Sequence, residues 1–225
     1  LIRAAAGCGA DAVKLQKRDL TTWEARDPDA WNRPYNSENA FGETYGKHRA
    51  ALEFGFEQYR ELQSYADDLG LVFFATAFDV ASLQFLAELG VPAIKLASAS
   101  IVDPPLLDAC AVLGQPVIAS SGGATEAEIH AAMSHLRGRS PWLRTPVALL
   151  QCTAEYPCDP RDMNLAVIPW LRELYPEVII GLSDHYVGIA LEPVAYALGA
   201  RIIEKHFTLS RASKGTDHAF SLEPV

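Results

Sequence analysis

The sequence lacks any run of lysine or arginine and any long apolar stretch. Its 225 residues carry 19 Lys and Arg against 28 Asp and Glu, which gives a formal net charge of -9. Without a positive patch, the chain has no field to hold a nucleic-acid backbone, so we expect no nucleic-acid partner. No apolar segment approaches the roughly 20 residues that cross a bilayer, so we expect no membrane partner either.

Cysteine is scarce and shows no metal or redox spacing. Cys8, Cys110, Cys152 and Cys158 form neither a CxxC pair nor the pattern of a small disulfide framework. We therefore interpret them as reduced, structural thiols of a cytoplasmic protein. The first residues, LIRA, contain neither an initiator methionine nor the layout of a signal peptide.

Short apolar runs alternate with segments of helical periodicity. Runs of strand length lie at 11–16, 71–78, 93–98, 116–120, 147–152, 178–185 and 201–207. Apolar residues at three- and four-residue spacing predict helices at 49–70, 80–90, 106–114 and 125–138. This alternation is typical of a parallel sheet covered by helices. Since 49% of the residues are hydrophobic, residues 1–225 are enough for one domain.

Seven strand–helix units are one short of an eight-stranded barrel. The opening segment, LIRAAAGCGA, has the composition of the end of a helix that follows a strand. We therefore predict a TIM-type (β/α)8 barrel that lacks its first strand, which we expect upstream of residue 1. Residues 17–48, rich in Asp, Asn, Pro and aromatics, form the exception to the short connections between predicted elements. A loop of that length indicates an active-site loop.

Polar residues gather at the carboxyl ends of all seven predicted strands. In a barrel these ends meet on one face, where barrel enzymes place their chemistry. Lys14 and Lys95, together with several hydroxyl groups, predict a binding site for a phosphate or carboxylate. Two alternatives stay open: the lysines could pair with Glu204 or Asp184, and any single Ser or Thr could cap the following helix.

Two histidines, His185 and His206, end successive predicted strands. Adjacent parallel strands lie ~4.8 Å apart, so the two imidazoles can converge on one metal ion. With only two protein ligands, the metal ion keeps coordination positions open for water and substrate, as a catalytic metal requires. Asp184 and Glu204 could then support the ligands, while Lys205 should face the helix layer or form an ion pair. For either histidine alone, a hydrogen-bonded core side chain is the alternative.

Seven motifs follow one another in a fixed order over nearly the whole chain. They are VKLQ, FFATAFD, IKLASAS, PVIASSGGATEAEI, LLQCTAEYPCDPRDMNL, GLSDHYVGIALEPVAYALGA and IIEKHFTLSRASKGTDHAFSLEP. In this order they resemble the sialic acid synthase family. The resemblance implies a barrel enzyme that condenses phosphoenolpyruvate with an N-acylated amino sugar such as N-acetylmannosamine. The products are phosphate and a nine-carbon 2-keto acid.

The resemblance also implies a cofactor and partners. The family uses a divalent metal, typically Mn²⁺, with Mg²⁺ or Co²⁺ as alternatives. It forms homodimers in which a small C-terminal antifreeze-like domain reaches into the partner's site, and that domain does not occur in these 225 residues. We therefore expect small-molecule substrates and, for the full-length protein, a homodimer.

The resemblance assigns roles to ten residues. The catalytic residues are expected to be Lys14, Lys95 and Asp217, and the metal ligands His185 and His206. The substrate-binding residues are expected to be Thr76, Ser98, Ser120, Tyr156 and Ser183. Tyr156 and Asp217 match family positions near the sugar. The family positions that bind phosphoenolpyruvate are matched by Lys14, Thr76, Lys95, Ser98, Ser120 and Ser183. The loop from Asn36 to Tyr45 is expected to cover the sugar, and His218 has no assigned role.

The chain departs from the family pattern at three places. Ser100 replaces an acidic residue, for which Asp103 could substitute only if the loop shifts. Ala154 replaces an Asn or Ser that often assists ligand binding, and the first-strand glutamate is not in this sequence. Two alternatives follow: a related synthase for legionaminate, pseudaminate or spore-coat polysaccharide, and a catalytically impaired homologue that binds sugar or phosphoenolpyruvate without turnover.

Overall fold

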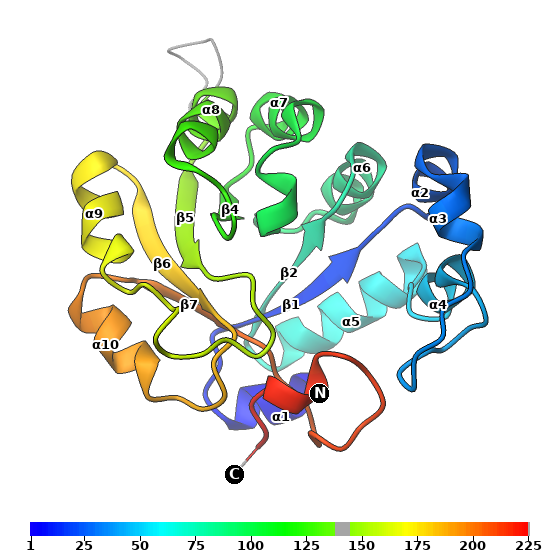
Figure 1. Cartoon of the computed structure of the whole chain (residues 1–225). Helices are drawn as coiled ribbons and strands as arrows, with labels where there is room; N and C mark the ends of the chain where they lie inside the picture. The colour runs from blue at the N-terminus through cyan, green and yellow to red at the C-terminus, as the bar shows by residue number, and fades with distance from the viewer. Residues whose placement is uncertain (138–144, 225) are drawn as a thin grey trace.

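Seven parallel strands form one curled sheet, and strands adjacent in sequence are adjacent in the sheet (Figure 1). A computed structural model describes residues 1–137 and 145–224. Each predicted apolar run contains one strand, so the prediction of seven parallel strands is confirmed. The strands are β1 (Ala12–Lys17), β2 (Val72–Ala77), β3 (Ile94–Leu96), β4 (Val117–Ser120), β5 (Val147–Cys152), β6 (Ile179–Asp184) and β7 (Ile202–Lys205). Within the described ranges β1 and β7 do not pair with each other, so the sheet is an open half-barrel.

Helices surround the outer side of the sheet (Figure 1). The hydrophobic core lies between them and the outward-facing strand residues, such as Phe73, Ile94 and Leu149. In the described part of the chain, no helix has the length and apolar character that crossing a bilayer requires. The surrounding helices are α1 (Ile2–Gly7), α5 (Phe56–Asp68), α6 (Val80–Leu89), α7 (Pro104–Leu113), α8 (Glu126–Arg137), α9 (Val167–Leu174) and α10 (Leu191–Ala197).

The predicted helices at 80–90 and 106–114 are confirmed, and local chemistry fixes their ends. Asp79 caps α6 by accepting a hydrogen bond from the Ser82 N–H at 2.6 Å. The helix ends at Gly90, whose φ of 78° is strained for a residue with a side chain. Helix α7 begins two residues earlier than predicted because Asp103 is its N-cap. Helix α8 agrees with the helix predicted at 125–138 as far as residue 137. Residue 138 lies outside the described residues.

The prediction of one helix over 49–70 is wrong. The segment divides into the end of α4 (Tyr45–Ala50) and the later helix α5, with residues 51–55 between them. Glu53 leaves the helical path because its carboxylate accepts hydrogen bonds from Lys17 at 3.0 Å and from the backbone N–H of Arg18 at 3.4 Å. Helix α5 then restarts at Gly55, whose N–H donates to the Gln58 side chain at 2.8 Å.

The prediction that residues 17–48 form an irregular loop is also wrong. This segment contains α2 (Leu20–Arg26), α3 (Pro28–Asn32) and the start of α4. Each helix begins at a side-chain cap, supplied by Asp19, Asp27 and Thr44 in turn. The helices are only five to seven residues long, so each lacks the repeated apolar spacing from which helices are predicted.

Candidate active site

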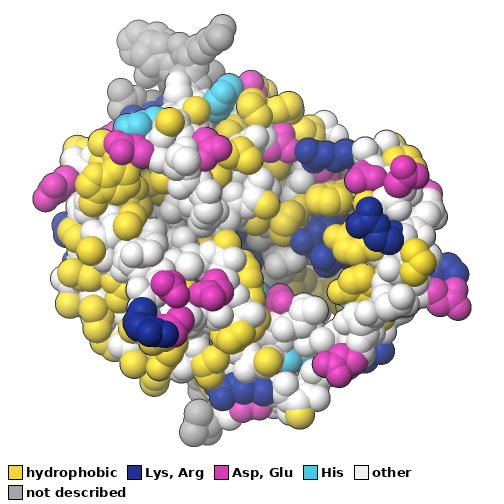
Figure 2. Space-filling view, viewed as in Figure 1, with side chains coloured by type: hydrophobic (Ala, Val, Ile, Leu, Met, Phe, Trp, Pro, Cys, Tyr) yellow, Lys and Arg dark blue, Asp and Glu magenta, His cyan; other side chains and the backbone are white. Residues whose placement is uncertain are grey.

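The inner side of the curled sheet carries a polar cluster at the carboxyl ends of the strands. The parallel register places Cys152 beside Ser183, and Ser183 beside Glu204. Viewed as in Figure 1, the centre of this face is hollowed, and Lys or Arg side chains lie at the hollow (Figure 2). We call this region the barrel mouth and define it by the inward-facing residues at the ends of β1 to β7.

Glu204 on β7 connects the two lysines of the barrel mouth. Its carboxylate lies 3.9 Å from Lys14 Nζ and 3.7 Å from Lys95 Nζ, and it accepts a hydrogen bond from Ser183 Oγ at 2.9 Å. Burial acts to raise the pKa of Glu204, but the two lysines and Ser183 outweigh it and lower the value to about 2. Glu204 is therefore ionised, and it links β7 to β1 across the open side of the half-barrel. The predicted ion pair with Glu204 is confirmed.

Lys95 is the most enclosed cation of the barrel mouth, with 2% of its side chain exposed. It donates to Ser120 Oγ at 2.7 Å and to the Leu96 carbonyl at 2.9 Å. Burial lowers the pKa of Lys95 to about 8, against the opposing charge of Glu204. Lys14 donates to Thr76 Oγ1 at 3.2 Å. Two lysines lie around the one carboxylate of Glu204, so this part of the barrel mouth favours an anionic ligand.

Ser98 lies at the start of the short 3-10 helix η1 (Ser98–Ser100), directly after β3. Its Oγ accepts a hydrogen bond from the Gly122 N–H at 3.0 Å. A Cβ at Gly122 would lie 2.7 Å from this oxygen and 3.0 Å from Cys152 Sγ, so only glycine fits here. The close approach of the 121–123 backbone therefore holds Ser98 beside Cys152 within the barrel mouth.

His185 and His206 lie together, with ring centroids 5.4 Å apart. Tyr156 packs against His185 at 4.1 Å between centroids, and Phe220 packs against His206 at 4.9 Å. Burial lowers the pKa of His185, and it lowers that of His206 to about 4. Both imidazoles are therefore neutral at pH 7 and retain a lone pair. The predicted convergence of the two histidines is confirmed.

The pair of histidines has the donor chemistry of a metal site. His185 Nδ1 donates to the Thr153 carbonyl at 2.9 Å, which leaves its Nε2 lone pair available, as in metal-bound histidines. Within the described residues, no group of three or more His, Cys, Asp or Glu side chains has metal-binding geometry. A metal here would accordingly be held by two imidazoles, with the other positions filled by water or substrate.

Asp217 lies at the rim of the barrel mouth, with one carboxylate oxygen 3.7 Å from His206 Nδ1. The predicted sugar loop reaches the same rim, because Asn39 Oδ1 accepts a hydrogen bond from the Gly215 N–H at 2.9 Å. His218, which had no assigned role, bonds to Thr208 Oγ1 at 2.7 Å through Nδ1. The loop from Asn36 to Tyr45 and the segment after β7 therefore border one opening.

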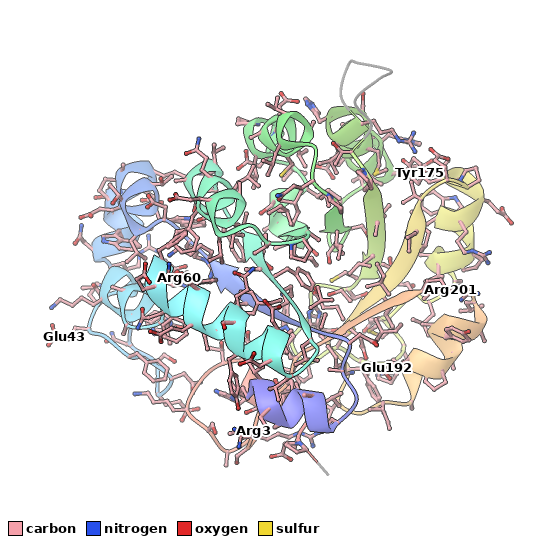
Figure 3. The ribbon with its side chains drawn as sticks, turned by 180° about the vertical axis from the view of Figure 1, so that it is seen from behind. Arg3, Glu43, Arg60, Tyr175, Glu192 and Arg201 are labelled. Atoms are coloured by element: carbon pink, nitrogen blue, oxygen red, sulfur yellow. The ribbon has the colours of Figure 1, made fainter. Side chains whose placement is uncertain are left out.

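Asp184 does not take part in the barrel mouth, which corrects two predictions. Among the residues that the structure describes, Asp184 forms no ion pair with Lys14 or Lys95 and no hydrogen bond with either histidine. The alternation of strand side chains turns it toward the helices. There it forms an ion pair with Lys205, which also lies 3.0 Å from Glu192 on α10 (Figure 3 labels Glu192). The predicted ion pair of Lys205 is confirmed.

The positions that depart from the family pattern do not supply an extra acid. Ser100 is buried at the end of η1. Asp103 caps α7 by accepting from the Leu106 N–H at 3.2 Å, and it lies 3.9 Å from Arg26. It is therefore engaged outside the barrel mouth and does not replace the missing carboxylate. Ala154 lies near Gly122, where a Cβ would approach it to 3.3 Å.

Eight of the ten predicted site residues lie at the barrel mouth, and Tyr156 and Asp217 border it through contacts with His185 and His206. Sequence reasoning missed two further residues, Cys152 and Phe220. Cys152, interpreted as structural, ends β5 at the inward position beside Ser183. The strand-end position in LLQC could have identified it. Phe220 in η2 (His218–Phe220) packs on both imidazoles, and no spacing pattern in the sequence connects it to them. The four cysteines are free thiols, as expected.

Comparison with known proteins identifies the family to which the chain is similar. The model of the NeuB family matches residues 1–225. N-acetylneuraminate-9-phosphate synthases from Mus musculus and Homo sapiens are each 41% identical over 224 residues, covering 100% of this chain. The chain spans 61% of the length of these two relatives. N,N'-diacetyllegionaminic acid synthase from Legionella pneumophila is 35% identical over 232 residues, or 100% of this chain and 63% of that protein.

Solved structures agree with this result. N-acetylneuraminic acid synthetase from Leptospira borgpetersenii, in complex with citrate, superposes with a TM-score of 0.84 and 36% identity. The match covers 99% of this chain and 71% of that one. DAHP synthase from Thermotoga maritima superposes with a TM-score of 0.70 at 16% identity. The match covers 99% of this chain and 58% of that one, and at this identity it supports the fold alone. Sequence motifs, family model and structural similarity agree, and the chain belongs to the NeuB family.

Proposed function

We propose that the protein is a synthase that condenses phosphoenolpyruvate with an N-acylated amino sugar of the N-acetylmannosamine type. One water molecule is consumed, and the products are a nine-carbon 2-keto sugar acid and phosphate. The observation that carries this proposal is the barrel mouth, where two lysines held by Glu204 lie in the same opening as two neutral histidines. One half of the opening suits an anion, and the other suits a polarised carbonyl group.

The lysine half of the barrel mouth suits phosphoenolpyruvate. Lys14 and Lys95 would bind its phosphate and carboxylate as point charges, and the hydroxyls of Thr76 and Ser120 keep the two ammonium groups in place. Glu204 offsets part of the positive charge in the free protein. An anionic ligand is favoured because it adds the negative charge that one carboxylate does not supply.

The histidine half suits the open-chain aldehyde of the sugar. A divalent metal such as Mn²⁺, held by His185 and His206, would supply Lewis-acid polarisation of the carbonyl oxygen. Tyr156 and Phe220 pack around the imidazoles and limit their exposure to water. Asp217, at the rim, would accept hydrogen bonds from sugar hydroxyls. These residues would orient the aldehyde carbon toward C3 of phosphoenolpyruvate, where the new carbon–carbon bond forms.

The test is phosphate release by the intact protein with phosphoenolpyruvate, Mn²⁺ and a panel of acceptors. The panel includes N-acetylmannosamine and the precursors of legionaminate and pseudaminate. We expect release only when an acceptor is present, with the highest kcat/KM for an N-acetylmannosamine-type sugar. Preference for another precursor would assign the chain to a related synthase. Release that ignores the acceptor would contradict condensation.

Ser100 gives specific support to a second candidate, a homologue that binds ligands without turnover. The position is buried and uncharged, and Asp103 is engaged with α7 and Arg26 instead. Calorimetry with phosphoenolpyruvate separates the two candidates. Binding without any phosphate release in the acceptor panel would favour the impaired homologue, and a gain of turnover in Ser100→Glu would identify the cause.

A further inference from the structure

A buried ion cluster lies at the ends of β6 and β7, on the side of the sheet that faces the helices. It consists of Asp184 on β6, Lys205 on β7 and Glu192 on α10. Asp184 is 1% exposed, and the Lys205 side chain is 9% exposed. We call these three residues the Lys205 clamp. The alternation of strand side chains turns the clamp away from the barrel mouth, so it does not contact the proposed substrates.

The ammonium group of Lys205 has an acceptor for each of its three protons. It donates to the Asp184 carboxylate and to the Tyr186 carbonyl oxygen at 2.6 Å, and it lies 3.0 Å from Glu192 Oε1. A lysine ammonium has three N–H donors and no acceptor, so all of its bonding capacity is used by these groups. Lys205 therefore fixes the protein groups around it.

The Lys205 clamp holds the backbone on both sides of His185. Asp184 precedes His185 and Tyr186 follows it, and Lys205 donates to both of these neighbours. Asp184 Oδ1 also accepts a hydrogen bond from the Tyr186 N–H at 2.8 Å, which closes a tight turn with His185 at its centre. These contacts act on the backbone of His185 and not on its imidazole ring.

Lys205 also determines where His206 begins. It immediately precedes His206, and the parallel register pairs it with Asp184 as the last pair between β6 and β7. Within the described ranges, β6 is the only strand beside β7 in the sheet. The position of His206 relative to His185 therefore depends on the contacts between these two strands. The ion pair of Asp184 and Lys205 is the side-chain contact that immediately precedes both histidines in the chain.

We propose that Lys205 and Asp184 are positioning residues, which hold His185 and His206 at the spacing needed to bind one divalent metal ion. This inference rests on the metal site of the proposed function. The two imidazole centroids lie 5.4 Å apart, and the clamp ties together the two strand ends that carry them. Without the clamp, each imidazole can shift with its own strand end. Two ligands that must converge on one ion then bind it more weakly.

The test measures the Kd for Mn²⁺ of the intact protein and of Lys205→Met, with electron paramagnetic resonance to quantify unbound Mn²⁺. We expect the variant to bind Mn²⁺ about tenfold to a hundredfold more weakly, as is typical when a contact that orients a metal ligand is removed. Excess Mn²⁺ should restore phosphate release with phosphoenolpyruvate and acceptor, because the residues proposed to contact these substrates are unchanged.

Asp184→Asn is a second, milder variant. Its side-chain oxygen can still accept from the Tyr186 N–H, but the negative charge that pairs with Lys205 is lost. We expect weaker Mn²⁺ binding in this variant as well. If Lys205→Met does not fold, the Kd of Asp184→Asn decides the question.

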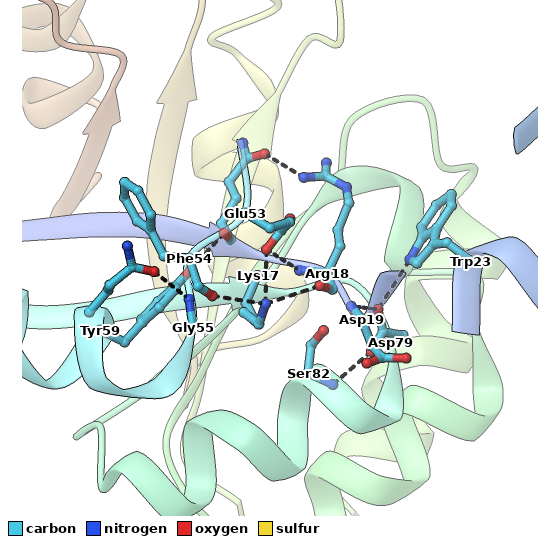
Figure 4. Close-up of polar contacts among 12 residues, drawn as sticks. Lys17, Arg18, Asp19, Trp23, Glu53, Phe54, Gly55, Tyr59, Asp79 and Ser82 are labelled. Carbon is cyan, nitrogen blue, oxygen red and sulfur yellow. Dashed lines mark hydrogen bonds and ion pairs between the residues drawn. The ribbon is translucent and has the colours of Figure 1, made fainter. Parts of the chain in front are cut away.

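The matched control is Lys17→Met at the end of β1 (Figure 4). The Lys17 side chain is 12% exposed, and its ammonium also has three acceptors. These are Glu53 Oε2 at 3.0 Å and the carbonyl oxygens of Arg18 at 3.2 Å and Phe54 at 3.3 Å. Loss of this lysine should lower the melting temperature as Lys205→Met does, whereas the Kd for Mn²⁺ should stay unchanged.

Two results would overturn the inference. One is a Kd for Mn²⁺ that is unchanged in the folded Lys205 and Asp184 variants, and this result would leave the proposed function standing. The other is equal weakening in Lys17→Met, because a general loss of stability would then explain the effect. Failure of the intact protein to bind Mn²⁺ would contradict the metal site itself, and the inference would fall with it.

Discussion

Replacing Lys95 with Met tests the anion site at its most enclosed cation. The substitution keeps an unbranched apolar side chain in a position that is 2% exposed, and it removes the ammonium group. Loss of a charge-assisted contact with phosphoenolpyruvate should cost about 1.5–3 kcal/mol of binding free energy. This corresponds to a tenfold to roughly hundredfold weaker Kd, which isothermal titration calorimetry measures directly.

The same substitution should not reduce stability. Burial lowers the pKa of Lys95 from 10.5 to about 8, so holding the charged form costs the folded state about 3 kcal/mol at neutral pH. Met has no such cost, although Glu204 then keeps only Lys14 as a cationic partner. We expect the melting temperature of Lys95→Met to equal or exceed that of the intact sequence. Weaker ligand binding without lower stability is the signature of a functional cation.

The pH dependence follows from the direction of the pKa shift. Between pH about 8 and 10.5 the unfolded chain holds the Lys95 proton and the folded chain does not. The free energy of unfolding therefore increases as the pH rises through this window. Affinity for phosphoenolpyruvate should fall above pH about 8, because the ammonium group is lost. In Lys95→Met neither change should occur. Lys47→Met, on the exposed face of α4 near Glu43, is the matched control.

One combination of results would refute this reasoning. If Lys95→Met binds phosphoenolpyruvate as tightly as the intact sequence but melts several degrees lower, then Lys95 has only a structural role in its ion pair with Glu204.

Three further substitutions test the rest of the site. His206→Ala should lose bound Mn²⁺ by elemental analysis and lose turnover while circular dichroism stays unchanged; retained stoichiometric metal and activity would contradict the metal assignment. Asp184→Ala leaves the buried Lys205 ammonium with the Glu192 carboxylate and the Tyr186 carbonyl, and loss of the second carboxylate should cost about 3 kcal/mol of folding free energy. The melting temperature should then fall by about 6–12 °C, and an unchanged value would show that the pair contributes nothing. Gly122→Ala pushes a Cβ against Ser98 and should raise the KM for phosphoenolpyruvate; an unchanged KM would separate Ser98 from the substrate.

The sequence predicted the strands and the inward-facing site well, because both depend on simple repetition. A polar residue at the end of each apolar run must lie near the others once parallel strands align, as Lys14, Ser183 and Glu204 do. His185 and His206 follow from the same argument. For these residues, chain position alone determines the neighbours.

The sequence predicted poorly wherever a side chain bonds across a large separation. Helix periodicity over 49–70 gave no sign that Glu53 would bond to Lys17, and this contact accompanies the break before α5. The short helices in 17–48 depend on caps such as Asp27, which a search for apolar spacing does not detect. Asp184 differs from the prediction because side chains alternate along β6, so the residue before the inward-facing His185 faces the helices.

The most direct test of the account is mass spectrometry of the product formed by the intact protein with phosphoenolpyruvate, Mn²⁺ and an N-acetylmannosamine-type acceptor. Three-carbon-labelled phosphoenolpyruvate should transfer all three labelled carbons to a nine-carbon 2-keto acid, with one phosphate released for each product molecule. Lys95→Met should form this product more slowly at the same substrate concentration. Recovery of the label only as unreacted phosphoenolpyruvate or as free pyruvate would contradict the assignment of the barrel mouth to condensation.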